Sequence, residues 1–391
     1  MKNMIIDNQE VIRKTELEKV CDKLYEVEKT KNYKEFYVFI KTTRLPFIPC
    51  HEKNTEIVYQ ECFRILHRIG EISIPVSVAL SMHYYILASL SSFPFSKKSI
   101  QYWKREVLLK KIEKDQILIA NTGSVRTFKE TSGNKGIVAQ KKRNVYIING
   151  RSPYMSLSGV ADYLVFTATL TNGTKAVFFL PANDDKIEFE EAVFGDTMKG
   201  SFTKSVTFKN LVVSSTNVIK LDTTNEERCE LLIYQRSWFQ ALVPGSYLGA
   251  AFCVISHLKA FSQKKIKNDK KLSESDNFLD SLGELMIKYK TGYMLCENAG
   301  TKLANFEKGN KASLDKIFEA SVVAKYFSTH FSEEIINKVR YIMGSKFLSP
   351  NSLTNKIYKE IVYGVLQPMT DIDIKAHFGK SVMNNTSCDF L

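Results

Sequence analysis

Residues 145–169 read VYIINGRSPYMSLSGVADYLVFTAT and contain two runs of strand-forming residues. Val, Ile, Tyr, Phe and Thr dominate both runs, and turn-forming Asn, Gly and Ser residues stand between them. β-branched and aromatic runs bounded by turn residues are typical of β-strands. Similar runs lie on both sides: ILIA (117–120), GIVAQ (136–140), KAVFFLP (175–181), FTKSVTF (202–208) and NLVVSS (210–215). The sequence therefore predicts a compact, barrel-like antiparallel β domain over residues 116–222.

Helical patterns occupy the chain before and after this β region. Apolar residues recur there at spacings of three and four, which places them on one face of an α-helix. The predicted helices cover residues 8–30, 55–70, 74–92, 226–262, 273–303 and 312–343, with a shorter one after Ser352. The segment 74–92 is apolar nearly all round, which predicts a helix buried inside a bundle.

The order of these patterns predicts an α+β fold. We expect an N-terminal α-helical domain over residues 1–115, the central β domain over 116–222 and a C-terminal helical bundle over 223–391. The charged segment Ser262–Leu272 predicts a solvated loop within the bundle. A chain of 391 residues has room for such domains, because single cores seldom grow past roughly 250–300 residues.

The composition is that of a folded chain with a basic surface. Hydrophobic residues make up 44% of it, and 55 Lys and Arg against 42 Asp and Glu give a net charge of +13. A positive surface favours partners with phosphate or carboxylate groups, such as nucleic acid, a nucleotide cofactor, coenzyme A or an acidic carrier protein. The basic clusters at 104–111, 141–143 and 264–271 lack interleaved aromatic residues, which argues against nucleic acid.

The chain shows no sign of export or of a membrane span. Its seven cysteines are scattered without a C-x-x-C pair, and no apolar run of signal-peptide length opens the sequence, so we expect a cytoplasmic protein without a metal site. The best candidate span, Ala241–Phe261, is interrupted by Pro244, His257 and Lys259. Its small residues Gly245, Gly249, Ala250 and Ala251 predict a buried helix packed closely on its neighbours.

Four segments, in one order, resemble the acyl-CoA dehydrogenase family. In the first, a strand ending in Asn149-Gly150 leads to Tyr154-Met155-Ser156, where the family has Asn-Gly followed by Trp-Ile-Thr/Ser. The other three are Tyr234-Gln235-Arg236 with Leu248-Gly249-Ala250-Ala251, Ala324-Lys325-Tyr326-Phe327 with Tyr341-Ile342-Met343-Gly344, and Lys356-Ile357-Tyr358-Lys359-Glu360. They extend over about 210 residues, which makes a chance match improbable.

The resemblance implies a flavoprotein whose C-terminal domain is a four-helix bundle. FAD would lie between the β domain and the bundle and reach a second subunit, so a homodimer or homotetramer is expected. By this resemblance Tyr154 packs beside the isoalloxazine ring and Ser156 hydrogen-bonds flavin N5, types that suit a flat ring and a developing charge. The remaining cofactor residues implied are Thr122, Ser124, Met155, Tyr341, Gly344 and Thr370, and the implied substrate residues are Arg126 and Arg236.

The family's catalytic base is missing from both of its usual positions. One position, a Glu in a turn after the last conserved Arg-Asp, falls on Pro368 or Gln367 here, and the other, just before the helix Arg, falls on Gln235. An amide keeps shape and hydrogen bonding but cannot accept the proton, and a positioned base contributes typically 10²–10⁴ in rate. The groups that could replace the base are Asp371, Asp373, Glu360 and His83. Each is also of a type that is commonly a cap, a surface acid or a buried polar group.

Two cofactor motifs of the family are also altered. The Thr/Ser-Glu-Pro loop is replaced by residues 120–126 (ANTGSVR), and the Arg-x-x-Phe-Gly run that holds the FAD pyrophosphate is replaced by the 262–272 segment. Lys264, Lys265 or Lys267 could supply the missing charge as point donors. The Gln that precedes Gly-Gly in the family is Tyr341 here.

These features leave three functional hypotheses open. The first is an FAD-dependent oxidoreductase that oxidises an acyl group held as a thioester on coenzyme A or a carrier protein in a biosynthetic pathway. The second is a monooxygenase of the same fold, which uses reduced flavin and oxygen and needs no glutamate base. The third is a flavin-free, non-catalytic paralogue that serves as a binding partner.

Overall fold

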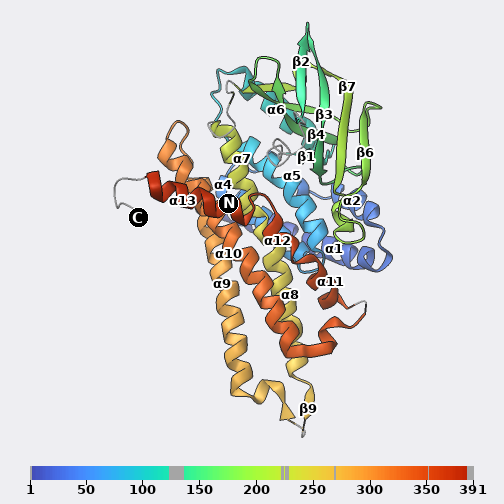
Figure 1. Ribbon diagram of the computed structural model, residues 1–391, viewed down its shortest axis with the longest axis vertical. Coiled ribbons are helices and arrows are strands. Elements are labelled where there is room, and N and C mark those ends of the chain that lie inside the picture. Colours follow the sequence, from blue (N-terminus) through green and yellow to red (C-terminus); the bar gives the residue numbers. More distant parts are fainter. Residues whose placement is uncertain are drawn as a thin grey trace.

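The computed structural model describes residues 2–122, 136–221, 224, 229–267, 270–350 and 352–384. A β-sheet lies at one end of the molecule, and a bundle of long helices extends away from it (Figure 1). The chain passes through a first set of helices, then the sheet, then the helices of the bundle. This order agrees with the predicted α+β fold.

The first set of helices packs around α5. Its members are α1 (Lys2–Thr30), α2 (Tyr33–Lys41), α3 (Ile48–His51), α4 (Thr55–Gly70), α5 (Ile74–Ser92) and α6 (Ile100–Lys114). Asn54 caps α4 by accepting bonds from the backbone N–H groups of Glu56 and Ile57, and Ser99 caps α6 in the same way at Tyr102. Helix α5 is buried on nearly every side, as its uniformly apolar sequence predicts.

The sheet is mixed, although most of its pairings are antiparallel. Its strands are β1 (Ile119–Thr122), β2 (Val138–Lys142), β3 (Val145–Met155), β4 (Tyr163–Leu170), β5 (Lys175–Pro181), β6 (Ile187–Ala192), β7 (Lys204–Ser214) and β8 (Val218–Leu221). They follow the order β6-β7-β3-β2-β4-β5-β8, with β1 beside β4.

The parallel pairings are a departure from the purely antiparallel sheet that the turns predicted. Strand β4 runs parallel to both β1 and β2. Because β2 stands between the successive strands β3 and β4, it is antiparallel to the first and parallel to the second. Local turn residues give no signal for a strand placed between two later ones.

The helical bundle is built from α7 (Glu230–Leu242), α8 (Pro244–Ser262), α9 (Asp276–Ala304) and α10 (Lys311–Met343). The single helix predicted over 226–262 is wrong, because α7 ends at Leu242 and α8 begins at Pro244. Proline cannot donate a backbone hydrogen bond and is tolerated in the first turn of a helix. The predicted loop 262–272 contains a short hairpin, β9 (Lys265–Lys267) and β10 (Lys270–Lys271).

Three shorter helices close the chain. They are α11 (Leu353–Glu360), α12 (Tyr363–Leu366) and α13 (Asp371–Asn384). Figure 1 shows that the chain turns back after α10, so that α11 and α12 return along the bundle toward the sheet before α13 crosses its side. The segment between α12 and α13 is therefore near the end of the bundle that faces the sheet.

The two sets of helices meet where α4 crosses α8. A Cβ atom added at Gly249 would stand 2.0 Å from the backbone oxygen of His67, and one added at Gly70 would stand 2.3 Å from that of Ser246. The Ser77 hydroxyl bonds both the Leu66 carbonyl (2.7 Å) and the Ser246 hydroxyl (2.7 Å). The close packing predicted for the small residues of α8 is confirmed.

Two helical stretches of the described chain are long and apolar enough to cross a membrane, Ile74–Ser92 and Glu230–Ser262. Their most apolar windows are 89% and 83% buried inside the protein. Core helices of a folded protein are buried in this way, and the small residues of α8 predict such burial.

Candidate functional site

Tyr154 lies at the end of β3 with one ring face partly uncovered. Its side chain is 46% exposed, and its ring stacks on Phe194 with centroids 5.9 Å apart and planes at 12°. Phe194 in turn meets Tyr363 of α12 edge-on at 5.0 Å, and the Tyr363 hydroxyl contacts that of Thr197 at 2.9 Å. These rings connect the end of β3 to the start of the α12–α13 segment.

Hydroxyl groups follow Tyr154 on the sheet side. The Ser156 hydroxyl is buried and lies 2.9 Å from the Thr203 hydroxyl, which lies 2.8 Å from that of Ser201. Thr122, at the end of β1, makes a short hydroxyl contact with Ser152 of β3. Met155, between Tyr154 and Ser156, is fully buried in the core.

Helices α5 and α7 approach the end of β1. The Tyr85 hydroxyl donates to Asn121 Oδ1 (2.7 Å), and Asn121 donates to the Met82 carbonyl (2.5 Å). Burial raises the pKa of Tyr85 and the charge of Arg236 partly offsets the rise, which places the Arg236 guanidinium near this hydroxyl. Tyr85 also packs edge-on against Phe239 of α7 (5.3 Å). The predicted substrate residue Arg236 lies on α7, the helix that packs against α5 through Phe239 and Tyr85.

The buried amides of α7 have free hydrogen-bonding capacity. Gln235 and Gln240 are 7% and 2% exposed. The Nε2 atom of Gln235 and the Oε1 atom of Gln240 have no hydrogen-bond partner among the described residues. Buried polar atoms nearly always have a partner, so these two atoms retain hydrogen-bonding capacity, although the two residues are five positions apart and do not share one face of α7.

Residues 367–370, where the resemblance to the family implies the base, lie between α12 and α13. The Gln240 amide donates to the Pro368 carbonyl (2.7 Å), and the Gln367 amide donates to the Tyr247 hydroxyl of α8 (3.3 Å). Neither Gln367 nor Pro368 can accept a proton. The two vacant base positions predicted from the sequence, Gln235 and Gln367–Pro368, are linked through α7, because Gln240 contacts Pro368 one turn beyond Gln235.

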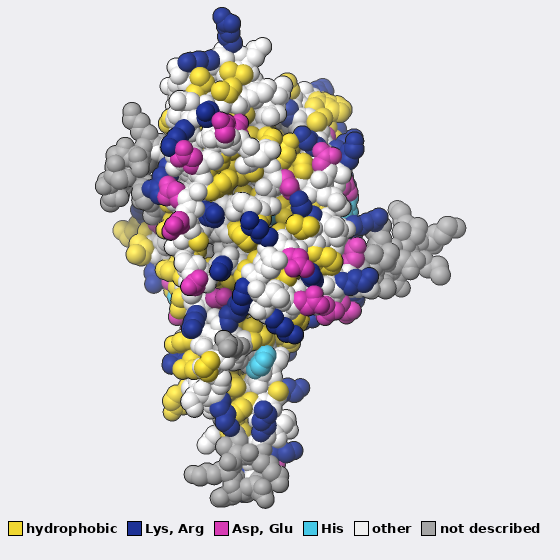
Figure 2. Space-filling model, turned by 90° about the vertical axis from the view of Figure 1, so that its right-hand side faces the viewer, with side chains coloured by type: hydrophobic (Ala, Val, Ile, Leu, Met, Phe, Trp, Pro, Cys, Tyr) yellow, Lys and Arg dark blue, Asp and Glu magenta, His cyan; other side chains and the backbone are white. Residues whose placement is uncertain are grey.

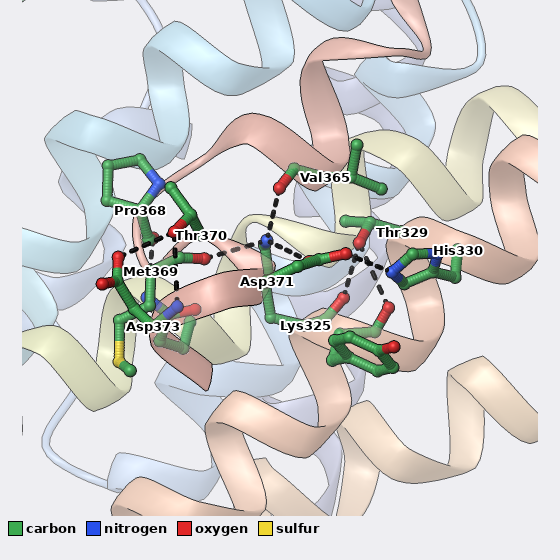
Figure 3. Close-up of polar contacts among 11 residues, drawn as sticks. Lys325, Thr329, His330, Val365, Pro368, Met369, Thr370, Asp371 and Asp373 are labelled. Atoms are coloured by element: carbon green, nitrogen blue, oxygen red, sulfur yellow. Dashed lines mark hydrogen bonds and ion pairs between the residues drawn. The ribbon is translucent and has the colours of Figure 1, made fainter. Parts of the chain in front are cut away.

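Asp371, the nearest acid to this segment, is engaged on the bundle side (Figure 3). Its Oδ2 atom lies 2.7 Å from His330 Nε2, and its Oδ1 atom lies 3.9 Å from Lys325 Nζ. Both partners belong to α10. The carboxylate therefore forms ion pairs with α10.

The other candidate bases have structural partners. His83 is fully buried, with Nε2 at 3.0 Å from the Pro46 carbonyl and Nδ1 accepting from the Ile119 N–H (3.1 Å). Burial lowers its pKa to about 4. Asp373 accepts from the Thr370 hydroxyl (2.8 Å), and its backbone N–H donates to the Thr370 hydroxyl oxygen (3.4 Å), so Thr370 caps the start of α13. The structure therefore does not bring His83 or Asp373 to Tyr154.

Glu360 belongs to a separate buried cluster. Its carboxylate lies 3.9 Å from Lys356 Nζ, which also pairs with Glu28 of α1. Burial raises the pKa of Glu360 to about 7, while the charge of Lys356 opposes the rise. The cluster fastens α11 to α1.

Tyr341 and Gly344 lie at the C-terminal end of α10, and Figure 1 shows this end of the helix well away from β3, the strand that carries Tyr154. Tyr341 is 83% exposed, and Gly344 follows α10 with φ +61°. Within one chain these two residues and Tyr154 do not share a site. Ser124 and Arg126 lie outside the described residues, as do the side chains of Lys265 and Lys267.

Other parts of the described surface show few features of a binding site. A hollow of about 230 Å³ between β5 and β7 contains none of the predicted residues. No group of three His, Cys, Asp or Glu side chains that could hold a metal is present in the described ranges. Figure 2 shows Lys and Arg side chains scattered among acidic and hydrophobic ones on the visible face.

Several residues at this place were not predicted. They are Phe194, Thr203, Tyr363, Gln240 and His330. The contacts of Lys325 with the 365–371 segment were not predicted either. Phe194 and Thr203 come from the β6–β7 connection, where sequence carries no periodic signal. Lys325 did carry one: it occupies a core position in the series Leu314, Ile317, Ser321, Ser328, Ser332 and Ile335, where a charged residue is unusual.

The comparisons with known proteins find the fold and no close relative. No family model matches the sequence, and no curated protein matches it. KijD3, solved with FMN and dTDP-3-amino-2,3,6-trideoxy-4-keto-3-methyl-D-glucose, superposes with a TM-score of 0.82 at 12% identity, over 96% of this chain and 95% of that chain.

Two further structures give the same result. TdsC from Paenibacillus sp. A11-2, a dibenzothiophene monooxygenase solved with FMN, has a TM-score of 0.76 at 14% identity, over 94% of this chain and 97% of that chain. FkbI, for biosynthesis of the methoxymalonyl extender unit of Fk520, has a TM-score of 0.75 at 12% identity, over 95% and 99%. The chain has the acyl-CoA dehydrogenase fold, so the fold that the sequence resemblance implied is confirmed.

Proposed function

We propose that this protein is a flavin-dependent monooxygenase of the acyl-CoA dehydrogenase fold. It would use reduced flavin and dioxygen to oxidise a small substrate in a biosynthetic pathway. The observation that carries the proposal is the set of groups at the two base positions: Gln235 and the Gln367–Pro368 pair, with Asp371 turned toward α10. Abstraction of a proton next to a thioester lacks a carboxylate there, whereas oxygen transfer does not need one.

The residues present fit a flavin ring. Tyr154 offers an uncovered aromatic face backed by Phe194, and flat rings pack well on such faces. The hydroxyls of Thr122 and Ser156 and the unpartnered amide atoms of Gln235 and Gln240 supply hydrogen-bonding groups. When bound, the flavin would supply the redox chemistry, and the chain would bind it, orient it and exclude water. KijD3 and TdsC were solved with FMN, which supports FMN as well as FAD.

Dehydrogenation of an acyl group on coenzyme A or a carrier protein is the second candidate. The likeness to FkbI, a protein of polyketide extender-unit biosynthesis, supports it, and a basic surface suits an acidic carrier protein or phosphate groups. In this case the base would have to come from a group other than Gln235, Gln367 or Pro368. A homodimer or homotetramer in the cytoplasm remains our expectation for either activity.

One experiment separates the candidates. The purified chain is titrated with FMN and with FAD, reduced by NADH through a separate flavin reductase, and followed for oxygen uptake. A monooxygenase consumes oxygen only with reduced flavin, and its bound flavin is not bleached anaerobically by acyl thioesters. Anaerobic bleaching by a thioester would favour the dehydrogenase, and failure to bind either flavin would leave only the non-catalytic paralogue.

Replacing Tyr154 tests the position of the ring. We expect Tyr154→Ala to weaken FMN or FAD binding about tenfold, because an aromatic pair contributes about 0.5–1.5 kcal/mol beyond its buried area. The measurement is quenching of flavin fluorescence on binding. Tyr102→Ala, which removes a tyrosine from the distant helix α6, is the matched control and should leave the affinity unchanged. Equal affinities of wild type and Tyr154→Ala would contradict the proposed position.

A further inference from the structure

Lys325 is a fully buried lysine whose ion-pair partner, Asp371, lies beyond hydrogen-bond distance. Its side chain is 0% exposed, and its Nζ atom lies 3.0 Å from the Met369 carbonyl and 3.3 Å from the Val365 carbonyl. Asp371 Oδ1 is 3.9 Å away and has no hydrogen bond of its own. Figure 3 shows the ammonium group of α10 pointing between these two carbonyls and Asp371.

The segment that Lys325 holds has few hydrogen bonds within its own backbone. Between α12 and α13, the described backbone bonds are Gln367 N–H to the Gly364 carbonyl (3.3 Å) and Ile374 N–H to the Thr370 carbonyl (3.0 Å). The carbonyls of Val365, Pro368 and Met369 are taken by side chains from the bundle, Lys325 and Gln240. Lys325 and Gln240 therefore hold the segment by its backbone, in addition to the side-chain contact of Gln367 with Tyr247.

The charge of Lys325 is costly to the fold. Burial lowers the pKa of Lys325 to about 8, and the attraction of Asp371 only partly opposes this. An apolar side chain of similar volume in such a place is often as stable or more stable than a buried charge. A buried lysine whose ammonium group contacts two backbone carbonyls of one segment is better explained by that segment than by the stability of the core.

We propose that Lys325 is a positioning residue, which holds Val365–Thr370 against α10 and so sets where Gln367 and Pro368 lie beside the cofactor. The inference rests on the proposed function in that Gln367 and Pro368 matter only if a cofactor binds beside them. The contact between Lys325 and the segment does not depend on that function. Asp371 is the charged group that faces Lys325, with His330 behind it on α10, while Gln240 on α7 and Thr329 on α10 are neutral.

The test compares Lys325→Met with Lys316→Met, which removes an exposed lysine from the same helix. Hydrogen exchange of the flavin-free protein is followed by mass spectrometry. In Lys325→Met the amides of 365–373 should exchange about tenfold faster, with a Tm equal to or above that of the wild type. Lys316→Met should leave both unchanged. If Lys325→Met does not fold, Lys325→Gln, which keeps a neutral donor, is measured in the same way.

The outcomes decide between positioning and a purely structural role. Unchanged exchange in 365–373 overturns the proposal, and so does faster exchange accompanied by a large loss of Tm. Each variant is then titrated with FMN to test whether the loosened segment affects flavin binding. If Lys325→Met kept the FMN affinity and the oxygen uptake of the wild type, the proposal would also be overturned. Absence of flavin binding by the wild type would refute the proposed function, while the exchange result would still decide whether Lys325 holds the segment.

The pH dependence gives a second readout. Because the pKa of Lys325 is lowered from 10.5 in the unfolded chain to about 8 in the fold, the unfolded chain binds more protons between these values. The wild type should therefore gain stability as the pH rises from about 8 toward 10, and Lys325→Met should lack that gain. A wild type and variant with parallel pH profiles would contradict a buried, charged Lys325.

Discussion

Gly249→Ala is expected to destabilise the protein by about 3 kcal/mol, whereas Gly283→Ala is expected to stabilise it by up to about 1 kcal/mol. The new Cβ at 249 would stand 2.0 Å from the His67 carbonyl oxygen and 2.9 Å from its carbon, both backbone atoms of α4 that cannot move alone. At Gly283, on the exposed side of α9, nothing lies within 4 Å, so only the better helix propensity of alanine acts. Urea unfolding followed by circular dichroism gives both free energies.

The opposite signs make the pair decisive. Both changes add one methyl group to a helical glycine, so differences in chemistry cannot explain different results. If Gly249→Ala were as stable as the wild type, the close crossing of α4 and α8 would be wrong.

Acid should weaken the fold through His83 by about 3 kcal/mol between pH 6.5 and pH 4. The folded pKa of about 4 lies below the unfolded value of 6.5, because burial disfavours the charged ring. Between pH 6.5 and about pH 4, His83 is protonated in the unfolded chain and neutral in the folded chain. The stability contributed by neutral His83 is therefore present above pH 6.5 and is lost as the pH falls through 4.

His83→Gln should remove most of this decline. The variant is expected to be less stable than the wild type at pH 7, since it loses one of the two ring hydrogen bonds, and the two should converge toward pH 4. A pH profile of His83→Gln that runs parallel to the wild type would show that His83 titrates normally and could act as a base.

The fold could be predicted from the sequence wherever local patterns are strong. The apolar segment 74–92 and the small residues of α8 gave buried helices, and the runs around Tyr146–Thr169 gave the strands. The parallel pairing of β4 with β1 and β2 could not be predicted, because it depends on a strand placed between two later ones. The break at Pro244 could have been predicted, since proline interrupts a continuing helix.

The candidate site could be predicted only in part. Tyr154, Ser156 and Gln235 remain predictions from their resemblance to a family segment; the first two lie at the end of β3 and the third lies on α7. The contacts that hold residues 367–370 could not be predicted from the sequence. Lys325 and Gln240 bond backbone carbonyls there, and every residue type has a backbone carbonyl. By residue type alone, His83 and Glu360 were plausible catalytic bases. Only the structure shows that both are buried among fixed partners, which argues against that role.

The glycine contacts between α4 and α8 also limit what the sequence must specify for this crossing to form. At Gly70 and Gly249 the requirement is for the lack of a side chain, and around them for bulk rather than for a particular reactive group. Many residue combinations satisfy such a requirement, so chains that differ at most positions can still form the same crossing. KijD3, with 12% identity and a TM-score of 0.82, shows that the overall fold forms from a very different sequence.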